Sequence, residues 1–502
     1  MSSRRVISLL AAAGLVLAPA APGAQEAAAS KAAARAVRPD ALTLPRPREP
    51  EWFGLYLLGK KAGWTRMEVV RERRGGSDVL VARQETVVQA SVGERNVERR
   101  QWDEKVYEAR PSGRLVEYRS RRSGDGGDRT LELRCTPQVC QATFRAEGGI
   151  PQIRDLPYPG ETAEQADPFR LAAALRGTVT GVQVEPEQLR VKKMKDSFLR
   201  RSRLRGAGVE VPVSIVSEME EGDRIPAEVA VADDGRVVEI HFGEALVARA
   251  EPEEVAKRLD RVDLFGISRV PLPAPLPRAV PQRIQYRLRG LPAGFHDADG
   301  RQVYAPGAPG ETVVTVTARE PAAARPGQDV PRGRVSEADR DLLRATPDVD
   351  SDNPEIARLA AEVVKGAPGV YAASSRLSHW VNRRLEKVYG QSRDRASEVL
   401  RVGKGDCTEH ALFFVAMARA AGIPARGVHG LVFAAYADGV PALYWHAWAE
   451  VKAGNEWIAV DPTFDQPVAD ATHLALGRGT QVDSVALLGS LSVVAAEAKG
   501  AP

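Results

Sequence analysis

The chain has 502 residues, of which 43% are hydrophobic and 27% are charged, and its net charge is only +4. This composition is typical of a globular protein with several domains, and the near balance of 70 basic and 66 acidic side chains argues against a nucleic-acid-binding or membrane-surface protein. Past the N-terminus there is no run of about 18 apolar residues, so we expect no stable membrane insertion.

The N-terminus has the features of an export signal. Two arginines precede an apolar stretch over residues 6–17, and small residues follow up to Ala24. This pattern predicts a signal peptide over 1–24, and the paired arginines leave twin-arginine export open as an alternative to the Sec route. We expect an exported protein, periplasmic or extracellular, with a linker rich in Ala, Arg and Pro over 25–50.

Alternating apolar and polar residues follow from Trp52 onward and predict antiparallel strands. A break rich in Pro and Gly near residue 160 divides this part of the sequence into two. We therefore predict a β-rich N-terminal domain over 51–160 and a second β-rich region over 161–318. A linker rich in Pro and Arg follows over 319–345.

Two of the three cysteines, Cys135 and Cys140, flank the residues TPQV between strand-like segments. Pro137 suits the second position of a four-residue turn. Strand pairing across this turn brings the Cβ atoms within bonding range, and an oxidising compartment favours the bond. We predict a disulfide here in preference to two buried thiols, which leaves Cys407 as the free cysteine.

Helical patterns begin after the linker and precede strands. Asp352 and Glu355 have the spacing of a capping box at the start of a first helix. A second helix follows it, a third begins at Cys407, and three strand-like segments come after that. Helices followed by an antiparallel sheet predict an α+β domain, which we place at 346–480, with a C-terminal tail over 481–502.

Three residues of this domain have the chemistry of a nucleophile, a base and an orienting carboxylate. Cys407 opens a helix, where unpaired N–H groups and the positive end of the helix dipole lower the pKa of a thiol and can receive an oxyanion. His446 lies within a strand and Asp461 ends the next one, with the tight turn Gly454-Asn455 between them. Antiparallel pairing then predicts that imidazole and carboxylate lie within reach of each other.

Around these residues the sequence resembles the transglutaminase-like superfamily. The segments GDCTEHALFFVAMARAAGIPARGVHG, HAWAEV and WIAVDPT are similar to its core motifs, and DQPVADATHLAL is similar to its bacterial secreted members of the cysteine protease type. The resemblance implies a papain-like fold, no cofactor or metal, and acyl transfer through a thioester. Cys407 matches the nucleophile, His446 the base and Asp461 the orienting residue. Trp380 and Gln391 are candidates for the second oxyanion donor.

The substrate class stays open among proteins, peptides and peptidoglycan peptides. We expect hydrolysis of a peptide or amide bond, with cross-linking to an amine as the alternative. Cross-linking requires a cleft that excludes water. A group of aromatic residues near the base either walls such a cleft or belongs to the core: Tyr444, Trp445, Trp448 and Phe464.

Two other functions are alternatives to an acyl-transfer enzyme. Cys407 and His410 have C-x-x-H spacing, and His446 would complete a metal site with them. The protein would instead be an envelope binding or scaffold protein if the triad is idle, since the β-rich part shows no catalytic constellation of its own.

Overall fold

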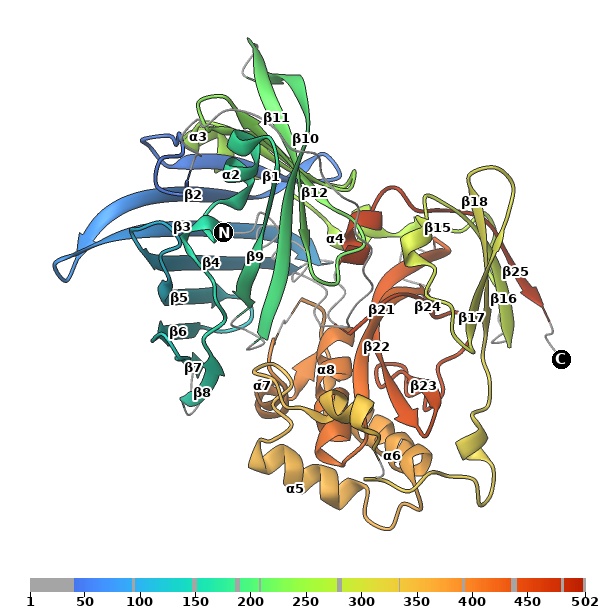
Figure 1. Ribbon diagram of the computed structural model, residues 1–502. Coiled ribbons are helices and arrows are strands. Elements are labelled where there is room, and N and C mark those ends of the chain that lie inside the picture. Colours follow the sequence, from blue (N-terminus) through green and yellow to red (C-terminus); the bar gives the residue numbers. More distant parts are fainter. Residues whose placement is uncertain are drawn as a thin grey trace. The chain divides into compact units, whose positions relative to one another are not determined.

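The computed structural model describes residues 40–92, 95–146, 151–185, 190–206, 209–277, 282–333, 335–390, 393–434, 440–479 and 483–499 (Figure 1). The predicted signal peptide and the first part of the predicted linker lie outside the described residues. The described chain forms two compact units, 40–90 with 98–262 and 91–97 with 263–499, here called the N-terminal and C-terminal units. No helix within the described ranges is long and apolar enough to span a membrane.

One antiparallel sheet of 14 strands makes up most of the N-terminal unit. Its strands are β1 (Glu51–Leu57), β2 (Lys60–Arg74), β3 (Ser77–Val92), β4 (Arg95–Glu108), β5 (Leu115–Gly124), β6 (Arg129–Cys135), β7 (Val139–Ala146), β8 (Gln152–Pro157), β9 (Thr178–Glu185), β10 (Arg190–Gly206), β11 (Val209–Glu220), β12 (Ala227–Ala232), β13 (Val237–Phe242) and β14 (Leu246–Ala250). Their order is β8-β7-β6-β5-β4-β3-β2-β1-β14-β13-β12-β11-β10-β9. Helix α2 (Pro168–Leu175) packs on the strands β9 to β12.

The structure corrects the division that the sequence predicted at residue 160. Strand β1 pairs with β14, with Phe53 opposite Ala250 and Leu57 opposite Leu246, so one sheet runs across that position. The second β-rich region also ends as a compact body at residue 262 and not at 318. The pairing of β1 with β14 joins residues far apart in sequence, so the local periodicity of either strand does not predict it.

The sheet has two arms, β8 to β1 and β14 to β9 in the strand order, and a buried carboxylate joins them. Glu161 accepts hydrogen bonds from Lys105 Nζ at 2.5 Å and from the Tyr107 hydroxyl at 2.7 Å, both on β4. Its other oxygen accepts from the backbone N–H of Val184 on β9 at 2.7 Å. Because β4 and β9 belong to opposite arms in the strand order, this side chain holds the curled sheet together.

The predicted disulfide is present at the hairpin between β6 and β7. Cys135 and Cys140 are opposite each other in the register and are joined by an S–S bond. Cys407 is consequently the remaining free thiol of the chain.

The C-terminal unit combines helices with two main sheets. Its elements are α4 (Leu264–Ser268), β15 (Val270–Pro271), β16 (Arg283–Arg289), η3 (Ala293–Phe295), β17 (Gln302–Pro306), β18 (Glu311–Thr317), η4 (Ala322–Ala324), η5 (Glu337–Leu343), α5 (Pro354–Val363), α6 (Val370–Arg384), β19 (Glu386–Lys387), α7 (Ala396–Val402), β20 (Lys404–Gly405), α8 (Cys407–Ala420), β21 (Ala425–Ala434), β22 (Ala442–Ala453), β23 (Glu456–Val460), β24 (Leu474–Arg478), η6 (Asp483–Leu487) and β25 (Ser492–Lys499).

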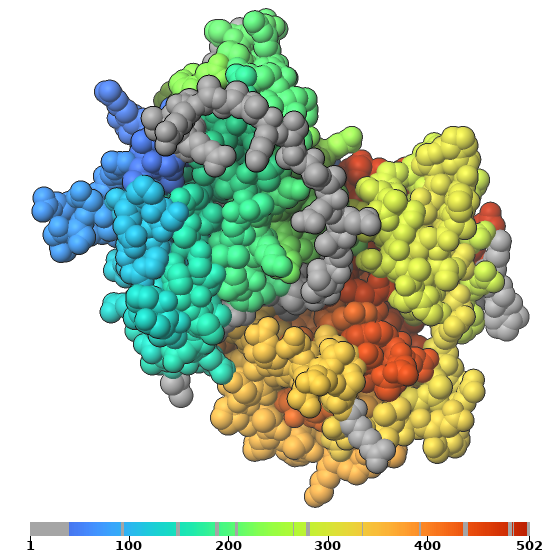
Figure 2. Space-filling view, in the orientation of Figure 1, coloured from blue at the N-terminus to red at the C-terminus, as the bar shows by residue number. Residues whose placement is uncertain are grey.

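These elements form three layers, of which the first consists of the helices α5 to α8. The middle layer is a five-stranded sheet in the order β15-β22-β21-β24, with β23 also paired to β22, and α8 packs on β21 and β22. The third layer is a four-stranded sheet in the order β17-β18-β16-β25. In Figure 2 the red atoms of the C-terminal strands lie between the orange helical segment and the yellow-green atoms of the four-stranded sheet. The α+β prediction for this part of the chain agrees with the observed layers.

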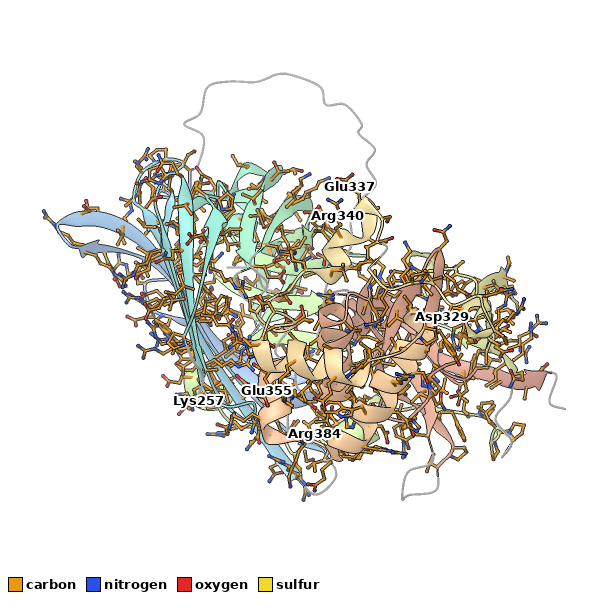
Figure 3. All side chains as sticks on the ribbon, turned by 90° about the horizontal axis from the view of Figure 1, so that it is seen from below. Lys257, Asp329, Glu337, Arg340, Glu355 and Arg384 are labelled. Carbon is orange, nitrogen blue, oxygen red and sulfur yellow. A yellow bond between two sulfur atoms is a disulfide. The ribbon has the colours of Figure 1, made fainter. Side chains whose placement is uncertain are left out.

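Two local predictions for this unit need correction. The predicted tail over 481–502 contains β25, which pairs with β16 as an integral strand of the small sheet. The residue that caps α5 is Asn353 and not Asp352, because its side chain accepts the N–H of Glu355 at 3.0 Å. The short helix α7 was not predicted. The linker also has a structural role, since Asp329, labelled in Figure 3, accepts the N–H groups of Tyr371 and Ala372 in the first turn of α6.

Candidate active site

Cys407 occupies the first position of α8 and lies within a complete capping box formed by Asp406 and Glu409. The Asp406 side chain accepts the N–H of Thr408 at 3.0 Å, and the Glu409 side chain accepts the N–H of Asp406 at 2.8 Å. Because the aspartate performs the capping, the next position is available to a thiol beside the N-terminal amides. The rest of α8 is apolar on nearly every side because helices α5, α6 and α7 and the sheet surround it.

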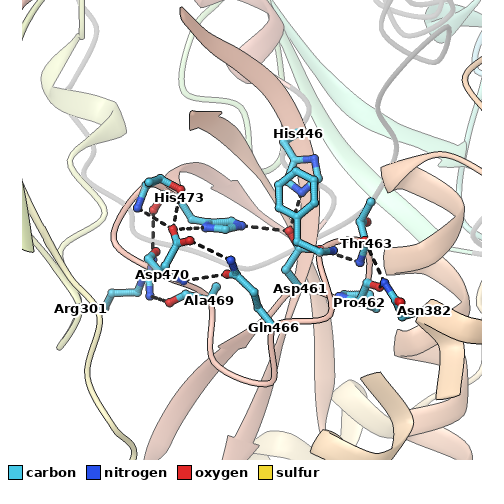
Figure 4. Close-up of polar contacts among 12 residues, drawn as sticks. Arg301, Asn382, His446, Asp461, Pro462, Thr463, Gln466, Ala469, Asp470 and His473 are labelled. Carbon is cyan, nitrogen blue, oxygen red and sulfur yellow. Dashed lines mark hydrogen bonds and ion pairs between the residues drawn. The ribbon is translucent and has the colours of Figure 1, made fainter. Parts of the chain in front are cut away.

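The predicted hairpin brings His446 and Asp461 together. Ala449 of β22 pairs with Val460 of β23, so Asp461 lies just beyond the paired strands. His446 Nε2 lies 2.7 Å from Asp461 Oδ2, and both side chains are buried (Figure 4). The register that the turn imposes therefore places the imidazole beside the carboxylate.

The Asp461 carboxylate is ionised and fully bonded. Its Oδ1 accepts the backbone N–H groups of Thr463 at 2.7 Å and Phe464 at 3.1 Å. Burial alone would raise its pKa, but the charge of His446 and the hydrogen bonds from His446 and His473 hold the pKa of Asp461 well below its usual range. An ionised carboxylate only accepts, so His446 Nε2 is the donor of this hydrogen bond, and Nδ1 is the ring nitrogen that remains for proton transfer.

The Cys407 sulfur faces β22 at Ala447, the residue that directly follows His446. It accepts a hydrogen bond from the backbone N–H of Ala447. Burial, followed by the negative charge of Asp406, nonetheless raises the pKa of the Cys407 thiol well above its usual value. The sequence predicted a lowered pKa from the helix terminus, whereas burial and the nearby carboxylates raise the pKa in the structure. The resting thiol therefore keeps its proton and needs a base before it can attack.

Asp461 has a second imidazole partner that sequence reasoning missed. His473 Nε2 lies 2.9 Å from Asp461 Oδ2, and its Nδ1 lies 3.1 Å from Asp470 Oδ1. The sequence offered one signal for it, since five of the seven histidines lie in the segment from His379 to His473. The spacing of His473 from Asp461 matches no simple strand or helix relation, because an irregular turn and loop separate them.

Comparison with known proteins places this segment in a family. Residues 357–462 match the model described as the transglutaminase-like superfamily. This segment belongs to that superfamily. It contains Cys407, His446 and Asp461, whereas His473 lies outside it. No curated protein matches the chain.

The chain also has weak similarity to solved structures. A proposed cysteine protease from Cytophaga hutchinsonii has 16% identity and a TM-score of 0.29, with 44% of this chain and 84% of that chain covered. The periplasmic domain of TgpA from Pseudomonas aeruginosa, bound to ethylmercury, has 21% identity and a TM-score of 0.23. There, 31% of this chain and 56% of that chain are covered, so little more than half of the relative is spanned. These similarities are too weak to bear on function.

The four aromatic residues near the candidate site differ in their exposure to solvent. The Phe464 ring stacks on the His446 ring with centroids 4.8 Å apart and planes 9° apart, and the residue is 40% exposed. Trp448 and Tyr444 are buried, and the indole N–H of Trp445 donates to the Ser268 carbonyl at 3.0 Å. Phe464 alone of the four is a large exposed apolar surface beside the imidazole.

The predicted alternative of a metal bound by Cys407, His410 and His446 finds no support in the geometry. His410 is buried inside α8, and its Nδ1 lies 2.7 Å from the Asp406 carbonyl. Among the described residues, the group with ligand atoms close enough for a metal is His446, Asp461 and His473, all within 4.8 Å. The ring nitrogens of His446 and His473 each lie at hydrogen-bond distance from the Asp461 carboxylate, so we describe a hydrogen-bonded cluster.

The second oxyanion donor stays unassigned. Trp380 packs against Phe413 with ring centroids 5.9 Å apart and lines a cavity of about 620 Å³ beside α6. Gln391 lies outside the described residues.

Proposed function

We propose that the protein is an exported cysteine hydrolase of peptide or amide bonds, built on a papain-like core with Cys407, His446 and Asp461 as its triad. The observation that carries this proposal is the buried bond of 2.7 Å between His446 Nε2 and Asp461 Oδ2, on the strand that faces the Cys407 sulfur. The disulfide at Cys135 and Cys140 supports export, because such bonds persist in oxidising compartments.

In the proposed reaction, His446 Nδ1 takes the thiol proton as the Cys407 sulfur attacks the substrate carbonyl carbon. A C–S bond forms, and the carbonyl electrons move to oxygen, where the N-terminal amides of α8 stabilise the charge. The C–N bond then breaks and the amine leaves with the proton from Nδ1. Water attacks the thioester, His446 takes its proton, and the acid departs as the thiol is restored.

Asp461 would hold the imidazole in the required tautomer throughout this cycle. Its two oxygens are fixed by two backbone N–H groups and two imidazoles, so the carboxylate has no freedom to rotate. Phe464 covers one face of the His446 ring, and this shields the hydrogen bond between His446 and Asp461 from water.

Competition between water and an amine tests the proposal. The full chain, produced by export, is incubated with a peptide library and an excess of labelled primary amine, with Cys407→Ala as the control variant. We expect free acid as the main product of the wild type and none from the variant. Predominant amine incorporation would favour the cross-linking alternative. Absence of both products together with an inert Cys407 toward iodoacetamide would favour a scaffold protein.

A further inference from the structure

The Asp461 carboxylate is shared by two imidazoles, and only His446 has a role in the proposed function. The other imidazole, His473, is fully buried, with a carboxylate on each ring nitrogen (Figure 4). The two distances are 2.9 Å to Asp461 and 3.1 Å to Asp470. Because ionised carboxylates only accept hydrogen bonds, both ring nitrogens of His473 carry protons and the ring is a cation.

Asp470 is held as the second acceptor by its own loop. Its Oδ1 accepts the N–H of Thr472 at 2.8 Å, and its Oδ2 accepts the side-chain amide of Gln466 at 2.8 Å. Burial would raise its pKa, but His473 and these donors keep the pKa of Asp470 well below its usual range. The negative charge beside His473 is therefore present at neutral pH.

The small sheet and its loops hold this segment from the other side. The Arg301 guanidinium donates to main-chain carbonyl groups of the loop 469–473, and the Tyr286 hydroxyl lies 3.5 Å from another. Burial raises the pKa of Tyr286, which keeps that phenol neutral, and Trp448 meets the His473 ring edge-on with centroids 5.2 Å apart. The charged or titratable groups that face His473 from all sides are Asp461, Asp470, His446 and Arg301.

We propose that His473, held by Asp470, is a positioning residue that sets the reactivity of Cys407, because its imidazolium fixes Asp461 against His446 and offsets part of the negative charge. Burial would lower the pKa of His473, but the two carboxylates outweigh it and raise the value. The inference rests on the proposed function for its meaning in catalysis. Its electrostatic effect on the thiol is measurable without any substrate.

The sign of that effect follows from the charge of Asp461. This carboxylate is among the groups that raise the pKa of the Cys407 thiol. A cation bonded to the carboxylate weakens its influence, so removing the cation makes the thiolate form at higher pH. For charges separated by several ångströms in a buried site we expect an upward shift of about half a pH unit or more.

The test follows alkylation of Cys407 by iodoacetamide in the full chain, by mass spectrometry, at pH values on both sides of the usual thiol pKa. Cys135 and Cys140 do not interfere because they are joined. In His473→Gln the amide can still donate to Asp461 but carries no charge. Asp470→Asn removes one of the two carboxylates that raise the pKa of His473, so it weakens the cation on Asp461 and tests the same effect if the first variant does not fold.

The matched control is His429→Gln. His429 is also buried, on the neighbouring strand β21, and burial lowers its pKa to about 4, so the substitution removes no cation. We expect the alkylation midpoint to move upward in His473→Gln, to move upward less in Asp470→Asn, and to stay in place in the control. An unmoved midpoint in both test variants, or an equal shift in the control, would overturn the inference. A shifted midpoint in a protein without hydrolytic activity would reject the proposed function alone.

Discussion

Each unit of the molecule contains a fully buried carboxylate, and the two have different partners. Glu161 in the N-terminal unit accepts side-chain hydrogen bonds from Lys105 and Tyr107. Asp461 in the C-terminal unit accepts them from two imidazoles. Both carboxylates also accept backbone N–H groups, one at Glu161 and two at Asp461.

The difference teaches how to separate a structural from a functional buried charge. An ammonium and a phenol ordinarily keep their protons across neutral pH, whereas an imidazole exchanges its proton there. The Glu161 cluster is therefore a permanent tie between the arms of the sheet. The Asp461 cluster contains side chains of the type that exchanges protons near neutral pH, and this property, more than burial, distinguishes the two clusters.

The largest effect is expected from Cys407→Ala. Turnover should be lost completely, because no other described group near His446 offers a nucleophilic sulfur. The fold should persist, since replacing a thiol with a hydrogen removes little packing. Product analysis by mass spectrometry together with thermal unfolding checks both statements. Wild-type turnover in this variant would show that the nucleophile is elsewhere.

Asp461→Asn and His446→Ala should reduce kcat/KM by about 10²- to 10⁴-fold, the usual worth of an oriented general base. An amide at position 461 cannot accept from both imidazoles with an ionised oxygen, so the His446 ring loses its orientation. Steady-state kinetics on the peptide identified by the product analysis measures the loss. A change in KM alone would show that these residues bind substrate and do not move the proton.

Glu161→Gln is the matched change in the N-terminal unit. We expect a loss of about 3–5 kcal/mol in the free energy of unfolding of that unit, because Lys105 is left buried without its counter-ion. Denaturant titration measures the loss, and Lys105→Met in the same chain should restore part of it. Alkylation of Cys407 should be unchanged. A slower alkylation would show that the two clusters do not have separate roles.

Removing the disulfide with Cys135→Ser and Cys140→Ser should have the smallest effect. The bond closes a hairpin with a sequence separation of 5 residues, so the chain-entropy model predicts a cost of about 2 kcal/mol or less. The same denaturant titration, compared with the wild type under reducing conditions, provides the value. Loss of the whole N-terminal fold would show that the hairpin is a larger part of its stability than the loop length implies.

The residues alone predicted Cys407, His446 and Asp461 as a candidate site, and they predicted the Cys135–Cys140 bond, which the structure confirms. Each of these predictions depends on a short-range relation: a cap followed by a helix, or two strands joined by a tight turn. In such cases the turn sets the register and the register places the side chains. The α+β character of the C-terminal unit followed in the same way from local periodicity.

Only the tertiary structure decided the features that depend on distant segments. The pairing of β1 with β14, the placement of β25 in the small sheet and the second imidazole on Asp461 all join segments that no local pattern relates. The raised pKa of the Cys407 thiol belongs with them, because the burial that raises it comes from the packing of distant segments around α8. Local sequence sets which groups are neighbours along an element, and the fold sets which charges and how much solvent those groups finally meet.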